Sequence, residues 1–97
     1  MTHYHFTGIG GAGMSSLARY TLEQGHTVTG TDLRDNPHIQ ELRTLGARIE
    51  IGHDPRHIHG ANVVVASGAI PDTNTELVAA RNNTIPCLLY TSDAADE

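Results

Sequence analysis

The chain has 97 residues, which is enough for one small domain but not for a nucleotide-binding domain joined to a separate catalytic domain. Its net charge of −5 argues against a nucleic-acid-binding surface, and no apolar run approaches the roughly 20 residues that a membrane span needs. The opening "MTHYHF" lacks the basic region of a secretory signal, so we expect a cytoplasmic protein.

All six basic residues are arginines, and the sequence contains no lysine. A Walker A loop uses a lysine to reach the nucleotide phosphates, and Schiff-base chemistry also requires one. Both kinds of site are therefore excluded for this chain.

Short β-type runs alternate with amphipathic helical runs along the chain. Strands are expected at residues 3–9, 26–31, 47–51 and 61–67, and a fifth strand is expected to begin at residue 84. Helices are expected from Gly13 or Met14 to Gln24, from Pro37 to Leu45, and over 76–83, while 52–60 is a loop with room for one helical turn. This alternation predicts an α/β fold: a Rossmann-like, doubly wound parallel sheet of about five strands in the order 3-2-1-4-5, with the last strand truncated.

A glycine-rich loop, "HFTGIGGAGMSS", joins the first strand to the first helix. Gly8, Gly10 and Gly13 match the pattern G-x-G-x-x-G, in which glycines permit a tight turn and let the backbone approach a diphosphate at a helix N-terminus. An acidic residue, Asp32, follows the second strand, where a carboxylate accepts hydrogen bonds from a ribose diol. The ribose could belong to NAD or to UDP, and Asp32 could instead be only a turn residue. The loop therefore predicts a diphosphate ligand without saying which one.

Three later blocks accompany the loop in order and at fixed spacing. They are Gly30-Thr31-Asp32 after the second strand, Gly52-His53 after the third, and the segment from Ser67 to Glu76 after the fourth. Together with "HFTGIGGAGMS" they resemble the N-terminal domain of the Mur ligase family over residues 3–86. Gly68 stands where the family has a second serine, and Thr75 where it has a proline. The loop favours the member that adds L-alanine over the one that recycles murein tripeptide.

The resemblance implies that this domain binds the UDP part of UDP-N-acetylmuramic acid and no redox cofactor. It implies diphosphate contacts from Gly8, Gly10, Gly11, Ala12, Gly13, Met14 and Ser15. It implies nucleoside contacts from Asp32, Leu33, Gly52 and His53, the last two near uracil. It implies that Ser67, Gly68, Ala69 and Ile70 line the crevice.

The resemblance also implies where the chemistry takes place. Family members use ATP and Mg to phosphorylate the muramoyl carboxylate, and the amine of L-alanine then displaces the phosphate. The ATP and amino-acid sites belong to other domains, so we expect no catalytic residue, cofactor or metal site in this fragment. The fragment should bind the substrate without ligating it.

The main alternative is an NAD(P)-binding Rossmann module of a dehydrogenase or regulatory protein. Arg34, close to Asp32, could then meet an NADP 2′-phosphate. A metal site at His53, His57 and His59 is a further possibility. Solvated loop histidines are the simpler interpretation, except for His53, whose position matches the family motif.

Four polar side chains near the loop have open roles. His3 and His5 alternate along the first strand and are expected to share a face, and for His5 packing and ligand roles are both open. Ser15 and Ser16 lack the surroundings of a nucleophile. We expect them to bond phosphate or backbone.

The last eleven residues, "CLLYTSDAADE", do not continue the family pattern. They match the in-frame translation of a transposase-based sequencing adapter. We therefore expect the domain to occupy residues 1–86 and residues 87–97 to be a non-native tail.

Overall fold

Five parallel strands form one sheet in the computed structural model, which describes residues 2–90. The strands are β1 (His3–Thr7), β2 (Thr27–Asp32), β3 (Arg48–Ile51), β4 (Val63–Ser67) and β5 (Cys87–Tyr90). Their order is β3-β2-β1-β4-β5, and every neighbouring pair is parallel. The structure confirms the predicted fold class and strand order.

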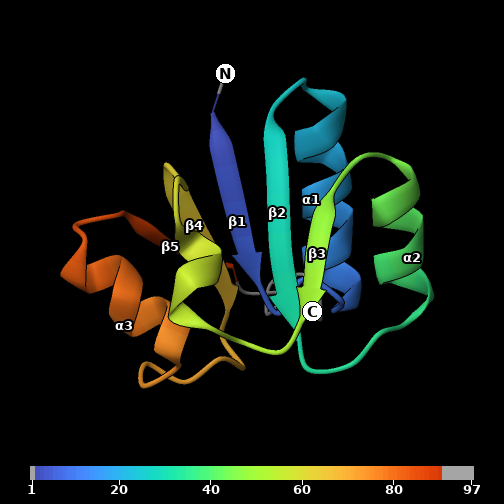
Figure 1. Ribbon diagram of the computed structural model, residues 1–97. Helices are drawn as coiled ribbons and strands as arrows, with labels where there is room; N and C mark the ends of the chain where they lie inside the picture. The colour runs from blue at the N-terminus through green and yellow to red at the C-terminus, as the bar shows by residue number, and fades with distance from the viewer. Residues whose placement is uncertain (1, 91–97) are drawn as a thin grey trace, which may run out of the picture.

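Helices cover both faces of this sheet (Figure 1). On one face α1 (Ala12–Glu23) contacts α2 (Pro37–Thr44), and on the other α3 (Thr75–Asn82) contacts the short 3₁₀ helix η1 (Pro55–Ile58). Right-handed crossovers that run in opposite directions from β1 and β4 produce this two-sided arrangement. No helix within residues 2–90 is both long enough and apolar enough to cross a bilayer.

Local sequence signals explain where the helices begin and end. The Asn36 side chain accepts a hydrogen bond from the Ile39 N–H (2.9 Å) ahead of Pro37 at the first turn of α2. Asn74 caps α3 in the same way through the Glu76 N–H (2.8 Å). At the other ends, Gly25 and Gly46 adopt positive φ angles that L side chains rarely adopt, which stops α1 and α2.

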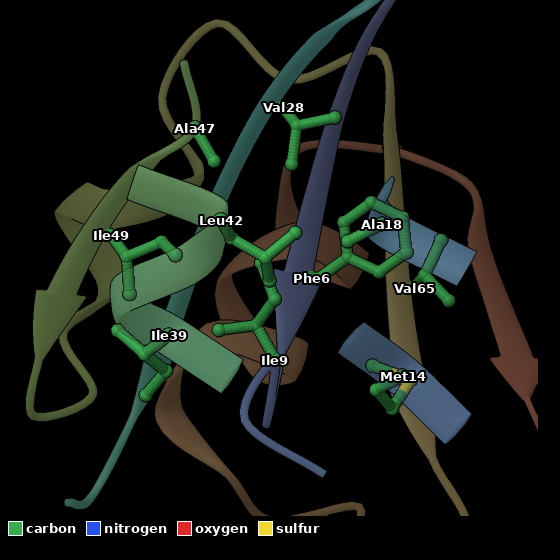
Figure 2. Close-up of a cluster of buried hydrophobic side chains, with 10 residues drawn as sticks. All are labelled: Phe6, Ile9, Met14, Ala18, Val28, Ile39, Leu42, Ala47, Ile49 and Val65. Carbon is green, nitrogen blue, oxygen red and sulfur yellow. The ribbon is translucent and has the colours of Figure 1, made fainter. Parts of the chain in front are cut away.

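The main apolar core lies between the sheet and the α1/α2 layer. Side chains from β1, the glycine loop, both helices and the neighbouring strands converge there, as Figure 2 shows. The buried members are Phe6, Ile9, Met14, Ala18, Val28, Ile39, Leu42, Ala47, Ile49 and Val65. The core fixes how α1, and therefore its N-terminus, sits on the sheet.

Three predicted strand boundaries are wrong by two residues or more. β4 begins at Val63 and not at residue 61, since the Ala61 N–H still donates to the Ile58 carbonyl oxygen of η1 (3.0 Å). β1 ends at Thr7 and not at residue 9, because Gly8 turns the chain with a φ of +85°. The fifth strand does not begin at residue 84, since Thr84 has a φ of 54° and completes the turn after α3. β5 instead consists of residues that the sequence analysis assigns to the tail, and its side chains are mostly exposed. The domain boundary at residue 86 stays a prediction.

Candidate functional site

The glycine loop lies at the carboxyl ends of β1 and β2. The N–H groups of Gly8 and Ile9 both donate to the Thr31 carbonyl oxygen, at 2.8 and 3.0 Å, so the loop is held against the end of β2. Gly11 occupies the N-cap of α1 and offers no side-chain hydrogen bond to the first turn. The first N–H groups of α1 are therefore left for solvent or for an anion.

Three glycines of the loop lie at close approaches. A Cβ on Gly13 would lie 2.6 Å from Tyr90 Oη. A Cβ on Gly10 would lie 2.7 Å from Asp32 Oδ2 and 2.8 Å from Asn36 Nδ2. A Cβ on Gly8 would lie 3.1 Å from Ile70 Cδ1, in addition to the strain of its positive φ. The loop is thus packed between the end of β2 on one side and the segment after β4 on the other.

Asp32 is part of the loop's support. Its Oδ2 accepts a hydrogen bond from the Gly10 N–H (2.8 Å), and its Oδ1 accepts one from the Leu33 N–H (2.7 Å). The structure therefore shows the turn-stabilising role, and it also occupies the Gly10 N–H that was expected to face a diphosphate. A carboxylate can accept about four hydrogen bonds, so Asp32 keeps capacity for a ribose hydroxyl. Its ribose contact stays a prediction.

The expected nucleoside residues lie together at the ends of β2 and β3. The Gly52 N–H donates to the Asp32 carbonyl oxygen (2.7 Å), and His53 Nδ1 lies 2.9 Å from Thr31 Oγ1. Leu33 is 68% exposed, which leaves its apolar side chain available to a planar base. Because β2 and β3 are neighbours, their carboxyl ends bring these four residues to one edge.

The expected crevice residues follow β4. Ser67 and Ile70 border Gly8, and the Ile70 N–H donates to the Ser67 carbonyl oxygen (3.1 Å). Gly68 and Ala69 are exposed. β1 and β4 are the strands between which the sheet changes direction, the usual ligand position in doubly wound folds.

A buried carboxylate, Glu76, lies on the α3 side of the sheet beneath this edge. It is fully buried and lies in the first turn of α3. Its Oε1 accepts hydrogen bonds from His5 Nε2 (2.9 Å), Thr7 Oγ1 (2.9 Å) and Thr31 Oγ1 (2.8 Å). Its Oε2 accepts the Asp54 N–H (3.0 Å) and His57 Nδ1 (3.2 Å). Five donors from β1, β2 and the segment after β3 thus meet at one side chain.

These donors keep Glu76 ionised although it is buried. Burial alone raises the pKa of a carboxyl group, but the hydrogen bond and electrostatic attraction of His5, with hydrogen bonds from Thr31 and the Asp54 backbone, outweigh it. The pKa of Glu76 falls from 4.5 to about 2. The carboxylate is therefore an acceptor only, so each group hydrogen-bonded to it must be the donor.

Comparison with known proteins identifies the family. The profile described as "Mur ligase family, catalytic domain" matches residues 3–92. The chain belongs to the Mur ligase family. It is 48% identical over 86 residues to the UDP-N-acetylmuramate–L-alanine ligase of Persephonella marina, and 52% identical over 84 residues to that of Thiobacillus denitrificans. These alignments cover 89% and 87% of this chain but only 19% and 18% of those proteins.

Solved structures of Mur ligases share the fold. The UDP-N-acetylmuramate–alanine ligase of Thermotoga maritima superposes with a TM-score of 0.88 at 31% identity, covering 92% of this chain and 21% of that one. A UDP-N-acetylmuramate:L-alanyl-γ-D-glutamyl-meso-diaminopimelate ligase from Neisseria meningitidis gives a TM-score of 0.84 at 29% identity, covering 92% and 28%. The chain therefore spans between 18% and 28% of the length of these ligases.

Within this Mur ligase fold, two predicted diphosphate residues have their side chains elsewhere. Met14 is 2% exposed and packs in the core, while the Ser15 hydroxyl donates to the Ala12 carbonyl oxygen (3.0 Å). Only the backbones of Met14 and Ser15 therefore remain as candidates for ligand contact. Ser16 also bonds the Ala12 carbonyl oxygen (3.1 Å), which agrees with the expected backbone role.

The loop histidines have different surroundings from one another. His57 is not simply solvated, because its Nδ1 bonds Glu76, and His53 Nδ1 lies 3.5 Å from the same carboxylate. His59 is exposed. In the part of the chain that the structure describes, no three His, Cys, Asp or Glu side chains are grouped closely enough to hold a metal ion.

The Glu76 cluster is a feature that the sequence analysis missed. It placed Glu76 in a family block without a role and left His5 open. A signal was present: polar residues alternate on β1 (His3, His5, Thr7) and on β2 (Thr29, Thr31). The register pairs His5 with Thr29 and Thr7 with Thr31, so one face of two central strands is polar and needs a buried partner.

Proposed function

We propose that this chain is the UDP-substrate-binding part of a UDP-N-acetylmuramate–L-alanine ligase. The observation that carries the proposal is the identity of about half of all residues to ligases of that name across nearly the whole chain. The position of the glycine loop at the carboxyl edge, beside an uncapped helix N-terminus, supports a diphosphate ligand.

Different segments of the proposed site would contact different parts of the substrate. The first-turn amides of α1 (Ala12, Gly13 and Met14) provide partial positive charge for the diphosphate. Asp32, Leu33, Gly52 and His53 surround the nucleoside, and Ser67 to Ile70 form the opposite wall next to Gly8. No side chain here is assigned a catalytic role.

The whole protein would join the muramoyl carboxylate to L-alanine with ATP and Mg, in the cytoplasm where ATP is supplied. The sites for ATP, Mg and alanine would lie in the remaining four-fifths of the ligase length. The absence of lysine in this chain agrees with an ATP site elsewhere.

We also propose that the domain covers residues 1–86 and that residues 87–97 do not belong to it. Within β5, Leu88 and Leu89 are 55% and 68% exposed and line, together with α1 residues, a pocket of about 520 Å³, whereas Tyr90 packs against Gly13 and the apolar core. Long-read sequencing past codon 86 tests the boundary. A native continuation in place of "CLLYTSDAADE" supports it, whereas a genuine stop codon after Glu97 contradicts it.

Ligand choice tests the function. Thermal stability and calorimetric binding would be measured with UDP-N-acetylmuramic acid, UDP, NAD and NADP. We expect the two uridine ligands to bind and stabilise the chain, and the dinucleotides to have no effect. Binding of NAD or NADP without any effect of UDP would instead establish the Rossmann cofactor module.

A matched pair of variants sharpens this test. Asp32→Ala removes the acceptor that holds the Gly10 N–H, so we expect UDP affinity to fall by about tenfold. Asp35→Ala removes a nearby carboxylate that pairs with Arg43 on the surface, and should leave UDP affinity unchanged. Equal effects of the two variants would argue against a ligand at this edge.

A further inference from the structure

The Glu76 cluster reaches the proposed nucleoside site through one hydroxyl group. Thr31 Oγ1 donates to Glu76 Oε1 at 2.8 Å and lies 2.9 Å from His53 Nδ1. His53 Nδ1 also lies 3.5 Å from Glu76 Oε2. Glu76 and Thr31 therefore contact only one of the two ring nitrogens of His53.

The hydrogen bonds from Glu76 through Thr31 to His53 determine the tautomer of His53. A carboxylate accepts hydrogen bonds and cannot donate them, so the single proton of the Thr31 hydroxyl is used toward Glu76. In its bond with His53, Thr31 Oγ1 must then accept, and Nδ1 must carry a proton. In a neutral imidazole with Nδ1 protonated, Nε2 is a bare acceptor.

The bare Nε2 is available to a ligand. It has no hydrogen-bond partner within residues 2–90, and the only buried side-chain nitrogen or oxygen without a partner in that range is Nδ1 of His26. Nε2 of His53 therefore reaches solvent. His53 directly follows Gly52, whose N–H joins the ends of β3 and β2 through the Asp32 carbonyl oxygen.

We propose that Glu76 and Thr31 are positioning residues that hold His53 as the Nδ1–H tautomer, so that its Nε2 accepts a hydrogen bond from the ring N3–H of a uracil base. The inference rests on the proposed function, which supplies a uridine nucleotide as the ligand. Uracil has a donor at N3, whereas cytosine has an acceptor there. The same fixed tautomer therefore favours uracil and rejects cytosine through two facing lone pairs.

Nucleotide analogues measure this selectivity directly. Calorimetry on the full 97-residue chain would compare UDP with CDP and with 3-methyl-UDP, which lacks the N3–H. We expect both analogues to bind about tenfold more weakly than UDP, the effect of leaving one polar group unpaired.

Variants separate positioning from general stability. Thr31→Val removes the hydroxyl that connects Glu76 to His53. We expect it to reduce the ratio of UDP affinity to 3-methyl-UDP affinity by about threefold or more. Thr31→Ser keeps the hydroxyl and should restore it. Thr7→Val is the matched control, because it also removes one hydroxyl donor from Glu76 Oε1 but has no contact with His53. It should leave the preference unchanged.

The outcomes distinguish this inference from the proposed function. If UDP does not bind at all, both are wrong. If UDP binds but CDP and 3-methyl-UDP bind equally well, the function stands and the tautomer inference is overturned. Equal loss of selectivity in Thr31→Val and Thr7→Val would also overturn it. Nitrogen-15 NMR of the imidazole provides an independent readout: the proton of neutral His53 is expected on Nδ1, and a proton on Nε2 would contradict the inference.

Discussion

The two faces of the sheet are stabilised in different ways. On the α1/α2 face, large side chains such as Phe6, Ile9, Ile39 and Leu42 fill the interface and are almost completely buried. On the α3 face, the apolar cluster is made of smaller residues, and half of it is alanine: Ile58, Ala61, Val64, Ala66, Leu77 and Ala80. Beside it, β1 and β2 present the polar groups that bind Glu76.

The two faces therefore have different structural roles. One holds helices on the sheet, and the other positions the segments at the edge of the proposed site. Apolar burial on the α1 face is non-directional, and it holds α1 and α2 against the sheet. The hydrogen bonds to Glu76 are directional, and they connect α3, β1, β2 and the loop after β3. The Glu76 cluster therefore defines the relative placement of the segments that carry the proposed nucleoside residues.

The largest expected effect is on the apolar face. Phe6→Ala should lower the free energy of unfolding by about 3–5 kcal/mol, because it removes a side chain that is 1% exposed and leaves a cavity. Urea denaturation measures the change. Tyr20→Ala, at a residue that is 59% exposed, serves as control and should cost less than about 1 kcal/mol. Similar values for both variants would show that this core is not packed as described.

The polar face should respond to pH where the apolar face does not. The difference between a pKa of 4.5 in the unfolded chain and about 2 in the folded chain corresponds to about 3 kcal/mol of stability above pH 4.5. This contribution is lost as the pH falls from 4.5 toward 2, because Glu76 becomes protonated. Glu76→Gln should therefore be less stable than the parent at neutral pH, and the gap should close over that range. A gap that stays constant down to pH 2 would contradict the ionised state.

Gly30 lies on β2 beneath the glycine loop, and the effect of adding a Cβ there can be compared with the same change at Gly11 in the loop. A Cβ at Gly30 would lie 2.4 Å from Ile9 Cδ1 and 3.0 Å from the Phe6 carbonyl oxygen. We expect Gly30→Ala to destabilise the fold by about 1–3 kcal/mol in urea denaturation, because the backbone contact cannot move away easily. At Gly11 the nearest heavy atom would be 3.8 Å away, so Gly11→Ala should leave stability nearly unchanged.

A smaller effect is expected at the N-cap of α2. Asn36→Ala removes the acceptor of the Ile39 N–H and the donor to the Gly10 carbonyl oxygen, and should cost about 1 kcal/mol. Thermal denaturation followed by circular dichroism measures it. Asn82→Ala, an exposed position near the end of α3, provides the reference and should change little.

The smallest effect is expected at β5. Leu89 is 68% exposed, so Leu89→Ser should alter the free energy of unfolding by no more than about 0.5 kcal/mol. Val64→Ser, at a residue that is completely buried on the neighbouring strand β4, should be strongly destabilising. A large effect at Leu89 would mean that β5 is covered in solution, and would count against the proposed boundary at residue 86.

Much of the architecture could be predicted from local patterns. The alternation of strands and helices indicated the parallel sheet and its order, and the asparagine, proline and glycine signals marked the helix ends. The glycine loop and Asp32 were recognised from their spacing and from their positions after predicted strands, and the structure brings them within hydrogen-bond distance. Errors occurred where backbone conformation overrides side-chain pattern, as at Gly8 and Thr84.

The site was less predictable because its central residue acts over long sequence separations. The amino-acid sequence by itself determined the fold class, the helix ends and the glycine loop, since these follow from periodicity, caps and φ preferences within a few residues. Only the tertiary structure decided that Glu76 accepts hydrogen bonds from Thr7, 69 residues away, and from Thr31, 45 residues away. Strand register sets those partners, and desolvation makes an unpaired carboxylate unfavourable there. The role of Glu76 is therefore a property of the packed sheet and not of its local sequence.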